Sequence, residues 1–209
     1  MSKERLYIFD TTLRDGAQTQ GVDFSLEDKE KIALALDKLG VDYIEAGWPG
    51  ANPTDTEFFQ KKHDFKNSKL TSFGMTKRSG RSAENDTGLS ALMNSNTSAV
   101  CLVGKSWDFH VDVALGITNE ENLDNISESA KHFVKAKKEF MFDAEHFSDG
   151  YKANPKYALS CIKAAYDQGA RWVILCDTNG GTLPHEITQI VSEVIKVVPG
   201  KNLGIHAHN

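Results

Sequence analysis

The amino-acid sequence predicts an α/β protein in which seven parallel strands alternate with helices. Short apolar runs of β-forming residues recur at intervals of about 30 to 40 residues, as in folds built from repeated βα units. Stretches with helix start and stop signals separate these runs, and no Gly-, Ser- or Pro-rich linker divides the chain. The 209 residues, 40% of them hydrophobic, are enough to bury one large core.

The first βα unit shows how each element is recognised. The run Leu6–Phe9 contains only apolar β-formers, so we expect a strand that is buried on both faces. A helix is expected from about Ser25, because Ser25 and Asp28 have the spacing of a capping pair. Gly40 stands where a helix C-cap belongs, so the helix is predicted to end there.

The remaining elements repeat this alternation. Further strands are expected at residues 41–44, 69–73, 98–103, 139–142, 172–176 and 203–206. Further helices are expected after Asn52-Pro53 and at residues 85–93, 119–137, 155–168 and 184–198.

This repeat favours a TIM-type (β/α)8 barrel, which needs roughly 250 residues. A doubly wound open sheet is the alternative, but the turn after the first strand lacks its glycine-rich phosphate loop. The sequence stops at Asn209, directly after the seventh expected strand. We therefore expect residues 1–209 to form an N-terminal catalytic barrel domain truncated after the seventh strand, without the eighth strand, the last helices and any C-terminal regulatory domain.

Composition and charge exclude several classes of function. The chain carries 24 Lys and Arg against 29 Asp and Glu, a net charge of −5, and so lacks the basic surface that nucleic acids and anionic membranes require. Its three cysteines, Cys101, Cys161 and Cys176, are isolated in apolar stretches, as expected in a reducing compartment. The apolar run before Asp10 is too short for a signal peptide or a membrane span. We expect a cytoplasmic protein without nucleic-acid or membrane partners.

Polar residues gather where the expected strands end. In a (β/α)8 barrel these carboxyl ends share one face, which carries the active site of barrel enzymes. One such residue would be ordinary loop polarity, whereas their coincidence favours a common pocket. They are Arg14 and Asp15 after the first strand, Glu45 after the second, Lys105 after the fourth, Asp143 and Glu145 after the fifth, Asp177, Thr178 and Asn179 after the sixth, and His206 and His208 at the seventh.

His206 and His208 indicate a possible metal site. Residues two apart on a strand point to the same side, so the two imidazoles suit one metal ion. An isolated His-Ala-His pair is more often hydrogen-bonded or solvent-facing. With Asp15 added, the set leaves about three positions of an octahedral ion open for water and substrate, which is the catalytic type of site.

Several motifs together resemble one family. Asp10-Thr11-Thr12-Leu13-Arg14-Asp15-Gly16-x-Gln18, Ile44-Glu45-Ala46-Gly47, Asp177-Thr178 and His206-x-His208-Asn209 are similar to motifs of the metal-dependent Claisen-condensing barrels. That family includes the 2-isopropylmalate, homocitrate and citramalate synthases and, more distantly, hydroxymethylglutaryl-CoA lyase. Finer stretches, such as Asp143-Ala144-Glu145-His146-Phe147 and Cys176-Asp177-Thr178-Asn179-Gly180-Gly181, look most like the citramalate synthase branch.

The resemblance implies an acyltransferase that condenses acetyl-CoA with a 2-oxo acid, here pyruvate, in isoleucine biosynthesis. It implies a divalent metal ion (Mg, Mn, Co or Zn) held by Asp15, His206 and His208, and a homodimer of the full-length protein. By position, Arg14 would stabilise the developing oxyanion and Thr178 would bind the carboxylate of the 2-oxo acid. Glu145 would position or activate the acetyl group, with Gln18 and Glu45 as supports near the substrate.

Other functions remain open at this point. A sister synthase would use a longer 2-oxo acid, as 2-isopropylmalate and homocitrate synthases do. An aldol-type lyase of the same superfamily would need a reactive cysteine near the seventh or eighth strand, where this chain has none. An Fe(II) oxygenase could use the same ligand set, although the βα pattern argues against it. The last alternative is a non-catalytic metal-binding fragment.

Overall fold

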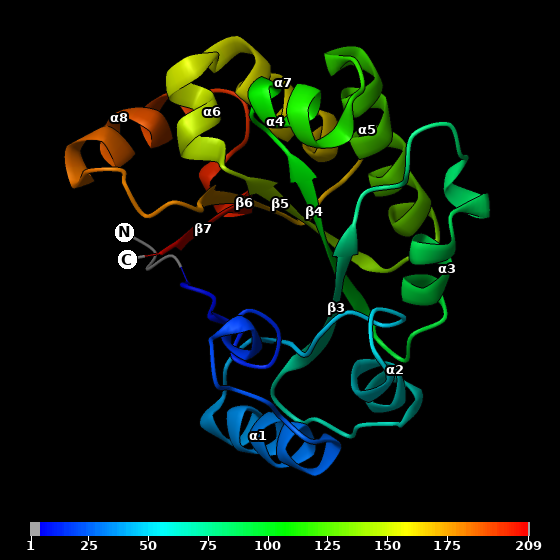
Figure 1. The fold of residues 1–209 in the computed structure, drawn as a ribbon. Helices are drawn as coiled ribbons and strands as arrows, with labels where there is room; N and C mark the ends of the chain where they lie inside the picture. Colours follow the sequence, from blue (N-terminus) through cyan, green and yellow to red (C-terminus); the bar gives the residue numbers. More distant parts are fainter. Residues whose placement is uncertain (1–4, 209) are drawn as a thin grey trace. The chain divides into compact units, whose positions relative to one another are not determined.

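The computed structural model describes residues 5–208 of the chain (Figure 1). It consists of two compact units. Unit 1 comprises the residues up to Gly74 together with Ala91–Val100, and unit 2 comprises Met75–Ser90 and the residues from Cys101 onward.

The strands follow one another in sequence order, from β1 to β7, and every pair whose register is given is parallel. A doubly wound sheet reverses its strand order at a switch point, whereas a (β/α)8 barrel does not. The order therefore confirms the predicted fold class, a TIM-type barrel, of which the described residues contribute seven strands. Across the described residues, no helix has the length and apolar character needed to cross a membrane.

Unit 1 holds the first elements of the repeat. Its strands are β1 (Phe9–Asp10), β2 (Tyr43–Glu45) and most of β3 (Lys69–Met75), and its helices are α1 (Leu26–Leu39) and α2 (Pro53–Gln60), with a short 3-10 turn η1 (Gly16–Gln18) after β1. Ser25 caps α1 in a complete capping box with Asp28, and Gly40 ends it in the left-handed conformation, as predicted. Asn52 caps α2 through the Asp55 amide. The apolar core packs α1 and α2 against β2.

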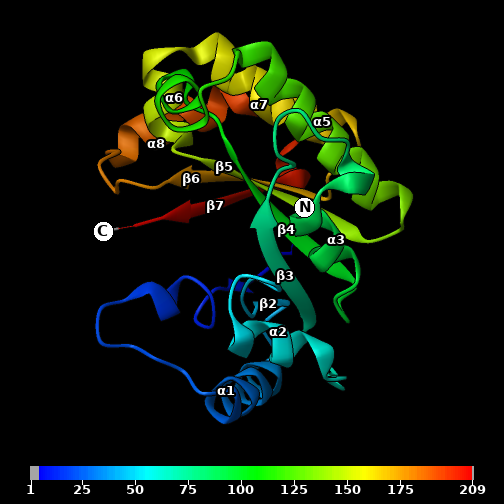
Figure 2. The same cartoon turned by 45° about the vertical axis from the view of Figure 1, so that its right-hand side comes forward.

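Unit 2 holds the later elements. They are η2 (Ala83–Asn85), part of α3 (Thr87–Met93), most of β4 (Ala99–Lys105), α4 (Asp108–His110), the π-helical η3 (Val111–Leu115), α5 (Asn119–Lys135), β5 (Glu139–Glu145), α6 (Phe147–Ala153), α7 (Pro155–Asp167), β6 (Trp172–Asp177), α8 (Pro184–Val194), η4 (Gly200–Asn202) and β7 (Leu203–Ala207). Strands β5, β6 and β7 run side by side, and α5, α6 and α7 pack along one face of them (Figure 2).

The prediction that Leu6–Phe9 forms a strand buried on both faces is wrong. Residues 5–8 have no regular structure, and only Phe9 and Asp10 form β1. Leu6 and Ile8 are 80% and 49% exposed. Residues 5–8 precede the part of β1 that pairs with β2, so this apolar run is not inside the sheet, where helices would cover both faces of a parallel strand.

Other boundaries differ by a few residues. Strand β5 continues to Glu145, so Asp143 and Glu145 lie within the strand rather than after it. Sequence patterns gave no indication of α4, η3 or α6, because each is short and lacks a helical apolar period. In the described part of the chain, Cys101, Cys161 and Cys176 are buried and outside any disulfide, as expected for small hydrophobic residues.

Candidate metal and substrate site

The loop after β1 presents Arg14 and Asp15 in a tight turn. The carbonyl oxygen of Thr11 accepts hydrogen bonds from the amides of Arg14, Asp15 and Gly16 at 3.1, 2.8 and 3.1 Å. Leu13, the residue before Arg14, is completely buried in the core of unit 1. The buried Leu13 side chain and the shared Thr11 carbonyl fix the turn, and with it the directions of the Arg14 and Asp15 side chains.

The guanidinium of Arg14 is held from three sides. Its Nε donates to Oε2 of Glu45 at 2.6 Å, and its Nη1 donates to Oδ1 of Asp15 at 3.1 Å. The Cζ atom of Arg14 lies over the ring of Phe73, 4.1 Å from the ring centroid. Glu45 is completely buried and the Arg14 side chain is only 12% exposed, so this charge pair is largely desolvated and its geometry is fixed.

A second buried charge supports the same loop, and sequence reasoning missed it. Lys29 of α1 is 4% exposed; its Nζ donates to the carbonyl oxygens of Leu13 and Ala46 at 3.1 and 2.7 Å and forms an ion pair with Asp55. The Asp55 carboxylate also accepts from the Trp48 amide at 2.8 Å. A signal was present, because Lys29 lies on the helix face of the apolar residues.

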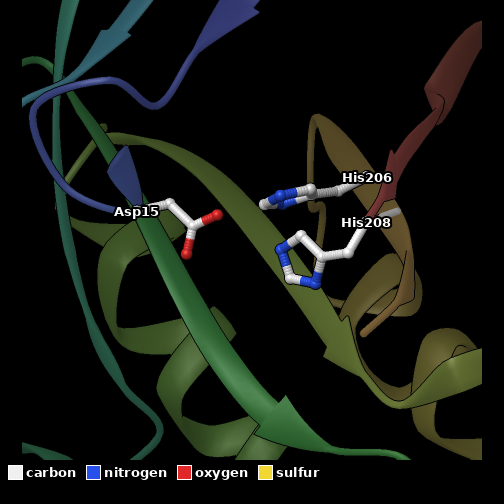
Figure 3. Close-up of side chains that lie close together, drawn as sticks. All are labelled: Asp15, His206 and His208. Carbon is white, nitrogen blue, oxygen red and sulfur yellow. The ribbon is translucent and has the colours of Figure 1, made fainter. Parts of the chain in front are cut away.

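Residues His206 and His208 lie near each other at the end of β7. Their ring centroids are 4.9 Å apart with an interplanar angle of 76°, and Figure 3 shows both side chains on the same side of the chain. This confirms that the two imidazoles share one side. His206 is within β7, and His208 follows its last residue.

The ring of His208 is oriented by a backbone carbonyl. Its Nδ1 lies 2.7 Å from the carbonyl oxygen of Thr178. A carbonyl oxygen can only accept, so Nδ1 donates this hydrogen bond; in the neutral ring Nε2 then keeps the lone pair that binds a metal ion. The hydroxyl of Thr178 accepts from the amide of His146 at 2.9 Å, and its own proton remains to be donated.

Glu145, the last residue of β5, forms an ion pair with Lys105, the last residue of β4. The next residue, His146, has a left-handed backbone (φ 53°) and begins α6. Its ring meets that of His110 edge to face, 4.5 Å between centroids. Burial lowers the pKa of His110 below its ordinary value, and the nearby His146 and Lys105 lower it further.

The predicted residues fall into two groups, one in each unit. Arg14, Asp15 and Glu45 are joined by hydrogen bonds in unit 1, and His206, His208 and Thr178 gather in unit 2 with Glu145 at the end of β5. Gln18 lies in the same turn as Asp15 and is exposed, and its amide donates to the Asp15 carbonyl at 2.9 Å. The catalytic, binding and ligand roles of all eight residues stay predictions.

Comparison with known proteins finds similar sequences among the citramalate and 2-isopropylmalate synthases. The (R)-citramalate synthase of Aquifex aeolicus is 54% identical over 208 residues, which are 99% of this chain and 39% of that protein. The 2-isopropylmalate synthase of Sulfolobus acidocaldarius is 29% identical over 209 residues, 100% of this chain and 52% of that protein. The chain thus spans about two fifths of the length of the curated citramalate synthase that it matches.

Fold comparison and family assignment agree. The HMG-CoA lyase of Bacillus subtilis superimposes with a TM-score of 0.81 over 99% of this chain and 70% of that structure, at 18% identity. Such a likeness concerns the fold alone. The family model described as HMGL-like matches residues 5–209. Because that match covers nearly all of its residues, the chain belongs to the HMGL-like family.

Proposed function

We propose that the full-length protein is an acyltransferase that condenses acetyl-CoA with pyruvate and releases citramalate and CoA. The observation that carries this proposal is the 54% identity to an (R)-citramalate synthase along essentially the whole chain. The 29% identity to a 2-isopropylmalate synthase makes a longer 2-oxo acid the less favoured substrate. The product places the enzyme in isoleucine biosynthesis, as the resemblance implies.

The proposed metal ligands are Asp15, His206 and His208. The donor set fits a divalent ion such as Mg, Mn, Co or Zn, because it combines a carboxylate with imidazoles on one side of β7. The hydrogen bond from His208 Nδ1 to Thr178 supports the assignment, since it leaves Nε2 as the coordinating atom. When bound, such an ion acts as a Lewis acid on the keto oxygen of the 2-oxo acid.

Arg14 is the proposed stabiliser of the oxyanion. As the methyl carbon of acetyl-CoA loses a proton and bonds to the keto carbon, the keto oxygen gains negative charge and later takes up a proton. Water then cleaves the thioester and releases the CoA thiol. A guanidinium fixed by Glu45, Asp15 and Phe73 offers its charge without reorganising during the reaction.

Thr178 and Glu145 have the proposed substrate roles. The Thr178 hydroxyl already accepts a hydrogen bond from the His146 amide, so its proton suits the carboxylate of pyruvate. Glu145, ion-paired with Lys105, would position or activate the acetyl group. Gln18 and Glu45 are proposed supports. We further propose that the full-length protein is a cytoplasmic homodimer.

Release of the CoA thiol tests the proposal. Full-length protein would be assayed with acetyl-CoA and, in turn, pyruvate, 2-oxoisovalerate and 2-oxoglutarate. We expect the largest kcat/KM with pyruvate and loss of activity after treatment with a chelator. A clear preference for 2-oxoisovalerate or 2-oxoglutarate would instead identify a sister synthase, and no thiol release with any of them would contradict an acyltransferase.

The ligand role of Asp15 can be tested without turnover. Asp15→Asn removes the anionic donor but keeps the size of the side chain, so Co²⁺ affinity measured by calorimetry should fall by more than about 100-fold, beyond the usual effect of groups that only orient ligands. Asp10→Asn, at the end of the strand that precedes the loop, is the matched control. Unchanged Co²⁺ binding by Asp15→Asn would remove Asp15 from the ligand set.

A further inference from the structure

We infer that Asp143 is the positioning residue for His206: its buried carboxylate holds the imidazole in the tautomer and orientation that bind the metal ion. The inference rests on the proposed function for its catalytic consequence. Its structural content concerns only unit 2, where both residues lie.

The sheet register brings Asp143 toward His206. Asp143 on β5 pairs with Ile174 on β6, and Cys176, two residues further along the same face of β6, pairs with His206 on β7. The side-chain oxygen of Asp143, the sulfur of Cys176 and a ring nitrogen of His206 all lie within 4.8 Å of one another. One water molecule or a small change in torsion angles closes such a separation.

Burial explains why this carboxylate matters. Asp143 is 4% exposed and Cys176 is 7% exposed. A carboxylate away from water is stabilised when it accepts hydrogen bonds, and a metal-binding imidazole needs an acceptor for its second nitrogen. Between the two neighbours of His206 in this cluster, the carboxylate is the stronger acceptor, because a thiol sulfur accepts only weakly.

The two histidines would then be oriented by different partners. His208 uses the neutral carbonyl of Thr178, 2.7 Å from its Nδ1, whereas His206 would use the anionic Asp143. A charged acceptor makes the opposite nitrogen a more basic metal ligand. The difference gives the test an internal control, because removal of Asp143 should change His206 and leave His208 as it is.

The experiment uses full-length protein labelled with ¹⁵N-histidine and free of metal. In Asp143→Ala we expect the ring nitrogens of His206 to change from one tautomer to a mixture, while those of His208 keep their chemical shifts. Co²⁺ affinity, measured by calorimetry with Co²⁺ alone, should fall by about 10- to 100-fold. Asp143→Asn, which keeps the volume and one acceptor oxygen, should fold in any case and show a smaller change of the same kind.

Cys176→Ser is the matched control from the same cluster and should leave both readouts unchanged. Identical His206 signals in the wild type and both Asp143 variants would overturn the inference, and so would a Cys176→Ser variant that reproduces their effect. Failure of the proposed function gives a different pattern: His206 would respond to Asp143 and Co²⁺ would bind, but no 2-oxo acid would release CoA thiol.

Discussion

The proposed site residues fall into an arginine half, formed by Arg14, Asp15 and Glu45 in unit 1, and a histidine half, formed by Thr178, His206 and His208 in unit 2. The arginine half is held by desolvated charge pairs, since Glu45 is completely buried and Arg14 nearly so. In the histidine half the backbone carbonyl of Thr178 orients His208, which is exposed, and the Asp143 carboxylate is the inferred partner of His206.

This difference matches the tasks proposed for the two halves. A group that stabilises developing charge works best when its dipoles and charges are fixed before the reaction, and buried ion pairs provide that rigidity. The metal and substrate ligands of the histidine half must instead leave atoms accessible, and hydrogen bonds to the other ring nitrogen orient the imidazoles. Substitutions should therefore affect stability and rate mainly in the arginine half, and substrate affinity mainly in the histidine half.

The largest effect is expected from Lys29→Met, because Lys29 binds the carbonyl of Leu13 in the loop that carries Arg14. It leaves the buried Asp55 without its cation, and removal of one partner of a buried pair costs about 3–5 kcal/mol of unfolding free energy. Urea denaturation would measure it. Lys31→Met, on the same helix but 69% exposed and paired with the exposed Glu27, should cost less than about 1 kcal/mol; equal losses in the two variants would show that the buried pair does not support the loop.

Arg14→Lys should reduce kcat by about 100- to 1000-fold, because an ammonium cannot reproduce the fork that joins Glu45, Asp15 and the oxyanion. Thiol release by full-length protein measures the effect, with circular dichroism to confirm folding. The control is Arg171→Lys, whose arginine stacks on Trp172 at 3.7 Å in unit 2 and should keep its activity. A well-folded Arg14→Lys enzyme with wild-type kcat would contradict the role of the arginine half.

Thr178→Val should raise the KM for pyruvate by about 10-fold or more with a smaller change in kcat, since a hydrogen bond to a charged group contributes about 1.5–3 kcal/mol. Thr178→Ser keeps the hydroxyl and should behave as the wild type. Steady-state kinetics with varied pyruvate separate the two constants. A KM within twofold of the wild type in the valine variant would show that Thr178 does not bind the carboxylate of pyruvate.

The smallest expected effect is a pH dependence from His110, next to the histidine half. Its pKa is lowered in the folded state by burial and by His146 and Lys105, so the unfolded chain binds the proton more readily. Stability is then retained above the unfolded value of about 6.5 and declines as the pH falls below it toward the folded value. Between pH 5 and about 7.5, the unfolding free energy measured by denaturation should change less with pH in His110→Gln than in the wild type. The control variant His185→Gln, at an exposed histidine, should show the same dependence of unfolding free energy on pH as the wild type.

The sequence by itself determined the order of the elements and the candidate residues. Local signals such as the Ser25 capping box and the Gly40 cap act within a few residues, so they can be read without the fold. The polar residues at the strand ends were also readable, because parallel strands in this repeat place their carboxyl ends together.

Only the tertiary structure decided which partners hold those residues. The pairing of Arg14 with Glu45, the buried Lys29–Asp55 pair and the approach of Asp143 to His206 join positions that are far apart in the chain. The exposure of Leu6 and Ile8 belongs to the same class, since it depends on which strands lie beside β1. Burial and charge pairing are properties of neighbours in space, and local sequence patterns do not contain them.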